Sequence, residues 1–192
     1  MWETGCQPSS ASINGKPAYV SYVSPTQLNV LAPDDDRVGP VQVEVDTPDG
    51  RSYPVTIQKQ QFAPALFMFD PAGRKYAAAV YPDGTYVGNA NLIPGVTSRP
   101  AVPSDVILLF GTGFGPANPA SPPGGVVGQP ATLSAPVTIR IGNVVADVAF
   151  AGLVGSGLYQ FNVTVPNVQS CPIQDDPEGR GCFQYKMILN IC

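Results

Sequence analysis

Proline and glycine interrupt this sequence at short intervals, and their spacing limits the secondary structure that the chain can form. The 192 residues include 22 prolines and 20 glycines. Proline lacks the backbone donor that a helix interior needs, and glycine weakens a helix through its conformational freedom. The segments between them are rich in β-branched and aromatic residues, which favour strands. We therefore expect an all-β protein made of short strands and turns.

Alternating apolar and polar residues identify individual strands. Valine occupies every second position from Val41 to Val45, with polar residues between, which is typical of a strand with one buried face. Pro48-Asp49-Gly50 is a turn sequence, and apolar residues resume at alternate positions from Tyr53 to Ile57. These two runs predict a β-hairpin.

An internal repeat relates an early and a late part of the chain. The motif A-x-V-x-aromatic spans Ala18–Tyr22 and recurs at Ala146–Phe150. The motif Q-x-N-V-x-x-P spans Gln27–Pro33 and recurs at Gln160–Pro166. The two motifs lie further apart in the second copy, and a glycine-rich insertion at residues 151–157 accounts for the difference. They occur in the same order, so we infer a duplicated supersecondary unit.

The repeat and the close spacing of the turns predict two immunoglobulin-like β-sandwiches. We place the first in residues 1–62 and the second in residues 104–192. The intervening residues 63–103 contain turn sequences at Asp70–Gly73 and Pro82–Gly84. We expect them to form a small connecting β-hairpin segment.

The first sandwich is expected to be incomplete. An apolar strand at Val106–Phe110 precedes the second copy of the repeat, whereas residues 1–12 before the first copy are polar and show no alternation. A missing strand leaves unpaired backbone groups at the edge of a sheet. We expect an added strand to complete the sandwich, with Phe183–Ile191 as the donor because its apolar residues alternate.

Several motifs resemble a known family. Phe110–Gly115, which follows an apolar strand, resembles the opening of IPT/TIG domains, an immunoglobulin-like family. Over residues 13–168 the chain is similar to an uncharacterised C-terminal domain family of secreted acidobacterial proteins. The matching segments are residues 14–18, 22–30, 63–67, 111–116, 151–153 and 157–163. The resemblance implies sandwich folds and an extracellular or cell-surface location, and it supplies no activity and no catalytic residue.

The cysteines predict disulfides rather than a metal site. The chain has four cysteines, no C-x-x-C motif and no histidine, whereas zinc sites usually use close cysteine pairs or cysteine with histidine. Two disulfides formed in an oxidising compartment are the favoured interpretation. Three pairings are open, and we favour Cys171–Cys182 across a loop and Cys6–Cys192 between the termini.

Charge and hydropathy exclude two classes of partner. The net charge is −4 and the ten basic residues are scattered, which disfavours binding to nucleic acid. No run of apolar residues is long enough for a membrane span, and Met1–Gln7 lacks the basic and apolar regions of a signal peptide.

The glycine-rich and acidic motifs favour structural roles. Gly111-x-Gly113-x-Gly115 resembles a phosphate-binding loop, but Pro116 and further prolines follow where a helix would have to begin, so we interpret it as a tight turn. The acidic runs at Asp34–Asp36 and at Asp175, Asp176 and Glu178 lack the ligand spacing of a calcium loop. We expect solvated loops there, and no metal, cofactor or nucleophilic catalysis.

Carboxylates, amides and aromatics leave alternatives open. Glu44, Asp105 and Asp147 are candidate acids for a carboxylate-based glycoside hydrolase, although nothing in the sequence brings two together. The repeated amides favour hydrogen bonds to neighbouring loop backbone over a sugar-binding role; they are Gln27, Asn29, Gln160 and Asn162. Tyr81 and Tyr86, if exposed, are candidates for stacking on a sugar.

These observations favour a non-catalytic extracellular structural or interaction module that self-assembles by strand addition. Its partners would be further copies of itself or a neighbouring domain of a larger protein. The alternative is a carbohydrate-binding module or a glycoside hydrolase, with a polysaccharide as partner.

Overall fold

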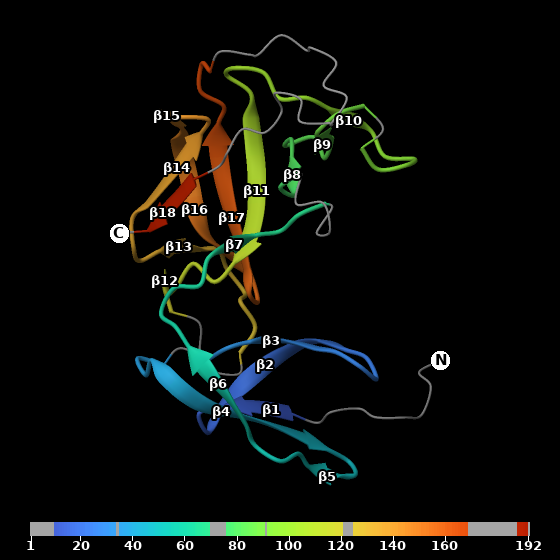
Figure 1. The fold of residues 1–192 in the computed structure, drawn as a ribbon, viewed down its shortest axis with the longest axis vertical. Coiled ribbons are helices and arrows are strands. Elements are labelled where there is room, and N and C mark those ends of the chain that lie inside the picture. Colours follow the sequence, from blue (N-terminus) through green and yellow to red (C-terminus); the bar gives the residue numbers. More distant parts are fainter. Residues whose placement is uncertain are drawn as a thin grey trace. The chain divides into compact units, whose positions relative to one another are not determined.

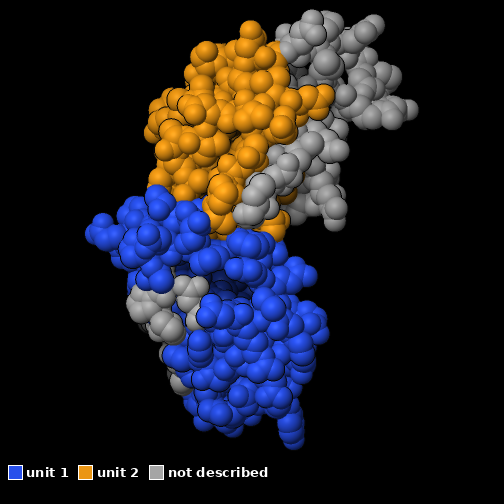
Figure 2. Space-filling model, turned by 90° about the vertical axis from the view of Figure 1, so that its left-hand side faces the viewer, with its two compact units in different colours: residues 1–63, 115–134, 153–158 blue, residues 64–114, 135–152, 159–192 orange. Residues whose placement is uncertain are grey.

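The computed structural model confirms that the protein is all-β (Figure 1). It describes residues 10–33, 35–69, 76–90, 92–120, 125–168 and the backbone of residues 188–191. In these residues it contains 18 strands and no helix. The chain divides into two compact units, coloured in Figure 2. Unit 1 comprises residues 1–63, 115–134 and 153–158, and unit 2 comprises residues 64–114, 135–152 and 159–192.

The first sheet lies in unit 1 and is wholly antiparallel. Its strand order is β3-β2-β1-β4-β5, and β6 also pairs with β4. The strands are β1 (Ser10–Ile13), β2 (Lys16–Val23), β3 (Leu28–Leu31), β4 (Gly39–Thr47), β5 (Gly50–Arg51) and β6 (Val55–Lys59).

The core of the first sheet is small. Its buried members are Ala11, Ile13, Ala18 and Val41, and three half-buried valines pack against them. The hairpin expected after Val41 is present, because β4 and β6 pair with Val41 opposite Ile57. However, Ile57 is 43% exposed and Tyr53 is 93% exposed, so the alternation in this second run does not face the core.

The segment before the first repeat does contain a strand, contrary to the expectation that residues 1–12 contribute none. Strand β1 lies between β2 and β4, with Ala11 opposite Ala18 on one side and Val45 on the other. Ala11 and Ile13 are buried. Two alternating apolar residues are enough here because both neighbouring strands cover them.

The second sheet has nine strands. Its order is β10-β9-β8-β11-β17-β16-β13-β12, and β7 pairs with β11 off this path. The strands are β7 (Ala65–Leu66), β8 (Ala79–Val80), β9 (Tyr86–Val87), β10 (Ser98–Arg99), β11 (Val106–Thr112), β12 (Ala117–Asn118), β13 (Ala131–Leu133), β16 (Asp147–Gly155) and β17 (Leu158–Thr164).

The segment expected to connect two sandwiches is part of this second sheet. Strands β7 and β8 pair directly with β11, and β8 and β9 form a hairpin in which Val80 is opposite Tyr86. The turn expected at Pro82–Gly84 closes it, because the Gly84 N–H donates to the Tyr81 carbonyl oxygen at 2.9 Å.

A third sheet, in unit 2, contains three antiparallel strands in the order β15-β14-β18. They are β14 (Val137–Ile141), β15 (Val144–Val145) and β18 (Ile188–Ile191). Strand β18 is the described part of the segment that we expected to complete the first sandwich. That expectation is wrong for these residues: β18 pairs with β14, and Leu189 lies opposite Ile139, which is completely buried.

Candidate functional site

The two copies of the repeat begin with the same hairpin. In unit 1, Ile13 pairs with Lys16 around a two-residue turn, and in unit 2, Ile141 pairs with Val144 in the same way. The first turn places Asn14 at φ 54° and Gly15 at φ 73°. Two positive φ angles are what a type I′ hairpin turn requires, and asparagine followed by glycine is the preferred sequence. The second turn is Gly142-Asn143, with Gly142 at φ 62°, so the two hairpins are equivalent in pairing and differ in the order of their turn residues.

The four repeated amides pair within each copy. The Gln27 side-chain amide donates to Asn29 Oδ1 at 2.7 Å, and the Gln160 amide donates to Asn162 Oδ1 at the same distance. In each pair the residues are two apart, which puts them on one face of an extended segment. We expected loop backbone as the partner, and the structure shows the neighbouring amide instead. The bond recurs in both copies.

Strand β17, in the second copy, is covered on both of its edges. It pairs with β16 on one side and with β11 on the other, where Leu109 lies opposite Phe161 and Ile107 opposite Val163. Phe161, Val163 and Leu109 are completely buried. Side chains directly opposite each other on antiparallel strands share a face, so β11 places apolar side chains beside those of β17.

Strand β3, the counterpart of β17 in the first copy, is covered on one edge. Within the described part of the chain it pairs with β2 alone. Leu28 and Val30, which correspond to Phe161 and Val163, are only half-buried. We call the uncovered side of residues 28–31 the β3 edge.

The strand beside β3 adds exposed apolar surface. Tyr22 and Val23 lie opposite Asn29 and Leu28, and they are 51% and 40% exposed. Tyr22 is the aromatic residue of the repeated A-x-V-x-aromatic motif, whose first residue, Ala18, is buried. In β2, a register shift between Val20 and Tyr22 separates the exposed end of the strand from the alternating residues at its start. A bulge of this kind has no clear sequence signal, so sequence reasoning missed this surface.

Phe114, within the glycine motif at Gly111–Gly115, packs into the core of unit 2. Phe114 is completely buried and packs edge to face on Phe161, with 4.6 Å between ring centroids. A Cβ on Gly111 would overlap the Ala65 carbonyl oxygen. Gly113 and Gly115 have positive φ angles of 78° and 86°, which favour glycine. These constraints account for the glycines without a bound phosphate.

The candidate acids are held in separate polar contacts. Asp105 Oδ2 accepts from the Val102 N–H, the Tyr81 hydroxyl and Arg99, at 2.9, 2.9 and 3.1 Å. The Val102 backbone bond is the main cause that holds the pKa of Asp105 below its usual range. Asp147 is an exposed residue at the start of β16.

Glu44 lies on β4 and lines a hollow of about 470 Å³ in unit 1. The other lining residues are Asn14, Gly15, Arg37, Pro40, Val41, Gln42 and Thr56. Glu44 is therefore the single carboxylate among the described residues that line this hollow. A glycosidase needs two carboxylates about 5–9.5 Å apart, and this lining supplies one.

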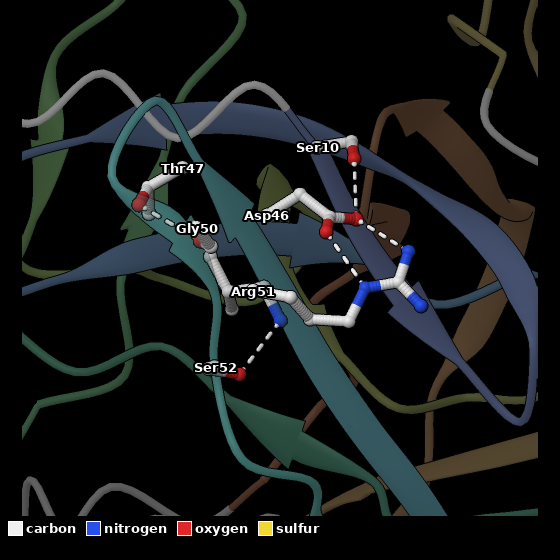
Figure 3. A network of polar contacts seen from close by, with 7 residues as sticks. Ser10, Asp46, Thr47, Gly50, Arg51 and Ser52 are labelled. Carbon is white, nitrogen blue, oxygen red and sulfur yellow. Dashed lines mark hydrogen bonds and ion pairs between the residues drawn. The ribbon is translucent and has the colours of Figure 1, made fainter.

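Acidic residues near the hairpins of unit 1 stabilise turns. Asp46 accepts two hydrogen bonds from Arg51, at 2.8 and 3.2 Å, and one from Ser10 at 3.3 Å (Figure 3). The Arg51 bond is the main cause that lowers the pKa of Asp46. Asp35 accepts from the Asn14 side chain at 2.7 Å, the largest cause of its lowered pKa, and from the Arg37 N–H at 2.9 Å.

The two candidate stacking tyrosines have different surroundings. Tyr81 is 3% exposed, so the idea that it stacks on a sugar at the surface is wrong. Tyr86 is half-buried and stacks on Phe69, with 4.9 Å between centroids and 7° between the ring planes. Asn89 donates to the Tyr76 hydroxyl at 3.2 Å, within unit 2.

Several candidate residues lie outside the described part of the chain. They are Asp34, Asp175, Asp176, Glu178 and all four cysteines, Cys6, Cys171, Cys182 and Cys192. Among the described residues, no group of three or more His, Cys, Asp or Glu side chains could hold a metal ion. The same residues include no helix of a length and hydropathy suited to crossing a membrane.

Comparison of the chain with protein-family models, with curated proteins and with solved structures gives no match.

Proposed function

We propose that this protein is a non-catalytic extracellular structural or interaction module that assembles by adding a β-strand to the β3 edge. The observation that carries the proposal is the difference between two equivalent strands. Strand β17 is paired on both sides, whereas β3 is paired by the described residues on one side only. An uncovered strand offers a row of backbone donors and acceptors to another chain.

The β3 edge also lacks the features that proteins use to block such contacts. Edge strands are commonly protected by lysine, by proline or by inward-pointing charges. Residues 28–31 are Leu-Asn-Val-Leu, and Tyr22 and Val23 beside them are exposed and apolar. An apolar edge of this kind favours association over solvation.

The state of the carboxylates supports a non-catalytic role. The described acids whose pKa values shift are Asp35, Asp46, Asp83 and Asp105, and each is shifted downward by hydrogen bonds. The general acid of a glycosidase needs a raised pKa so that it holds a proton at neutral pH. These four acids have the opposite shift.

A carbohydrate-binding module is the second candidate. Phe69, Tyr76, Tyr86 and Asn89 bring aromatic rings and an amide close together, as many sugar sites do. However, Phe69 and Tyr86 stack face to face, so each ring already uses one face on the other. This leaves the aromatic group less suited to a sugar than a row of exposed coplanar rings.

Light scattering and glycan binding separate the two candidates. We expect concentration-dependent self-association that Leu28→Lys reduces, because the lysine would be buried when a strand docks on the β3 edge. The control is Ile57→Lys on β6, which replaces an exposed apolar residue on another outer strand and should leave association unchanged. A monomer at every concentration that binds a glycan array would overturn the proposal in favour of the second candidate.

A further inference from the structure

The repeat also indicates what kind of strand would fit the β3 edge. We infer that it binds, in antiparallel orientation, an extended segment of the β11 type, with apolar residues at alternate positions. This inference rests on the proposed function and identifies the partner of the same edge. The occupant is a strand with this chemistry that belongs to another polypeptide chain.

The first step is the structural equivalence of the two copies. The alignment that matches Ala18 with Ala146 also matches the hairpin pair Ile13–Lys16 with the hairpin pair Ile141–Val144. The equivalence extends to a third strand. Ala11 pairs with Val45 on β4, and its counterpart Ile139 pairs with Leu189 on β18.

This third pairing explains why the C-terminal strand does not complete unit 1. Strand β18 occupies beside β14 the position that β4 already occupies beside β1. Strand β1 thus has its counterpart in β14, β4 in β18 and β3 in β17. Strand β2 corresponds to β15 and the start of β16, where Val148 and Phe150 match Val20 and Tyr22. Strand β11 is left over, because no described strand of unit 1 pairs with β3 as β11 pairs with β17.

The second step is the register. On β17, Leu109 lies opposite Phe161 and Ile107 lies opposite Val163. The match between the two Q-x-N-V motifs transfers these positions to Leu28 and Val30. The incoming strand therefore places one apolar residue opposite Leu28 and a second, two residues earlier in its own sequence, opposite Val30.

The third step is burial. Ile107 and Leu109 alternate with half-buried residues in β11, so its inner face is apolar and its outer face is partly solvated. Val30 packs against the buried cluster of unit 1 and is itself half-buried. A strand with the β11 pattern would cover Leu28 and Val30 and extend this cluster. A strand with charged residues at the two inner positions would bury them without partners.

A labelled peptide tests the inference on the full chain. Its sequence is that of residues 104–112, Ser-Asp-Val-Ile-Leu-Leu-Phe-Gly-Thr, preceded by two lysines for solubility. We expect saturable binding by fluorescence anisotropy and slower hydrogen exchange at the backbone amides of residues 28–31. A control peptide with lysine in place of Ile107 and Leu109 should bind at least about tenfold more weakly.

Protein variants locate the contact. Leu28→Lys should weaken binding of the first peptide by at least about tenfold, and Ile57→Lys should leave it unchanged. The melting temperature of each variant, compared with that of the parent, separates loss of the site from loss of the fold. Should Leu28→Lys fail to fold, the difference in binding between the two peptides and the hydrogen exchange of residues 28–31 in the parent protein still test the inference.

Three results would overturn the inference. They are equal binding of both peptides, no binding of either, and protection confined to β17, which would show exchange with the chain's own β11. If Leu28→Lys abolishes self-association but the peptide does not compete with self-association, this inference is wrong and the proposed function stands. Absence of both peptide binding and self-association would remove both.

Discussion

Tyr81 donates a hydrogen bond of 2.9 Å to Asp105 Oδ2, and the Arg99 guanidinium that binds the same carboxylate lies 3.5 Å above the Tyr81 ring centroid. Burial, followed by the bond to Asp105, raises the pKa of Tyr81 to about 12. The folded state therefore favours the neutral phenol, and the resulting stability is present below pH 10 and is lost as the pH rises through 12. We expect one phenol to titrate near pH 12 by phenolate absorbance while the protein stays folded, and Tyr81→Phe to remove that step. A Tyr81→Phe protein with an unchanged titration would contradict this assignment.

Asp105 determines how the stability of the same cluster changes at acidic pH. Its folded pKa is lowered, so its contribution to stability is present above its ordinary pKa and is lost as the pH falls through the folded value. We expect Asp105→Asn to lower the melting temperature at pH 7. The difference in melting temperature between the variant and the parent protein should decrease as the pH falls below about 4. Melting curves across this pH range provide the measurement. A gap that stays constant with pH would show that the charge of Asp105 does not contribute.

Equivalent valines in the two copies should differ in their contribution to stability. Val163 is completely buried under β11, whereas Val30 on β3 is half-buried. We expect Val163→Ala to cost about 2 kcal/mol and Val30→Ala about 1 kcal/mol or less in the free protein. Denaturant unfolding measures both values. Equal costs would argue that the β3 edge is covered.

Gly111 is expected to tolerate no side chain. A Cβ there would overlap the Ala65 carbonyl oxygen and approach Phe114 Cε2 at 2.8 Å, where β7 pairs with β11. We expect Gly111→Ala to destabilise unit 2 by about 2–3 kcal/mol in thermal or chemical unfolding. Gly128→Ala is the control, because its Cβ would meet no atom within 4 Å, and it should change stability by no more than about 0.5 kcal/mol.

The cysteines remain a prediction from sequence. If the chain forms two disulfides, its intact mass without reductant should be about 4 Da below its fully reduced mass. Peptide mapping then distinguishes Cys171–Cys182 with Cys6–Cys192 from the other pairings. Four thiols that react freely with an alkylating reagent would rule the disulfides out.

The sequence predicted best where a pattern was long or repeated. The alternating valines in residues 41–45 identified β4. The matching motifs identified hairpins that the structure shows to have equivalent pairing. Short patterns were less informative. Ala11 and Ile13 alone gave no signal for β1, although strands on both sides bury them.

Residues whose environment depends on distant segments were also beyond the sequence. From the sequence, Tyr81 resembles a surface tyrosine in a turn-rich segment. Its hydroxyl instead donates to Asp105, which comes after the whole β8–β9 hairpin in the sequence. The alternation in Phe183–Ile191 indicated a strand and gave no indication of its neighbour. In the structure this strand pairs with β14, because β4 already occupies the equivalent position beside β1.

Strand β2 pairs with β1 through Lys16–Ala18 and with β3 through Tyr19–Val23. One continuous segment of backbone is thus common to the buried cluster and to the β3 edge. Fraying of β3 therefore releases the end of β2, and a bound strand that orders β3 also restrains the start of β2. We therefore expect binding at the edge to slow local opening of β1 and β4 as well, so that recognition of a partner and cooperative folding of unit 1 are coupled in a single equilibrium.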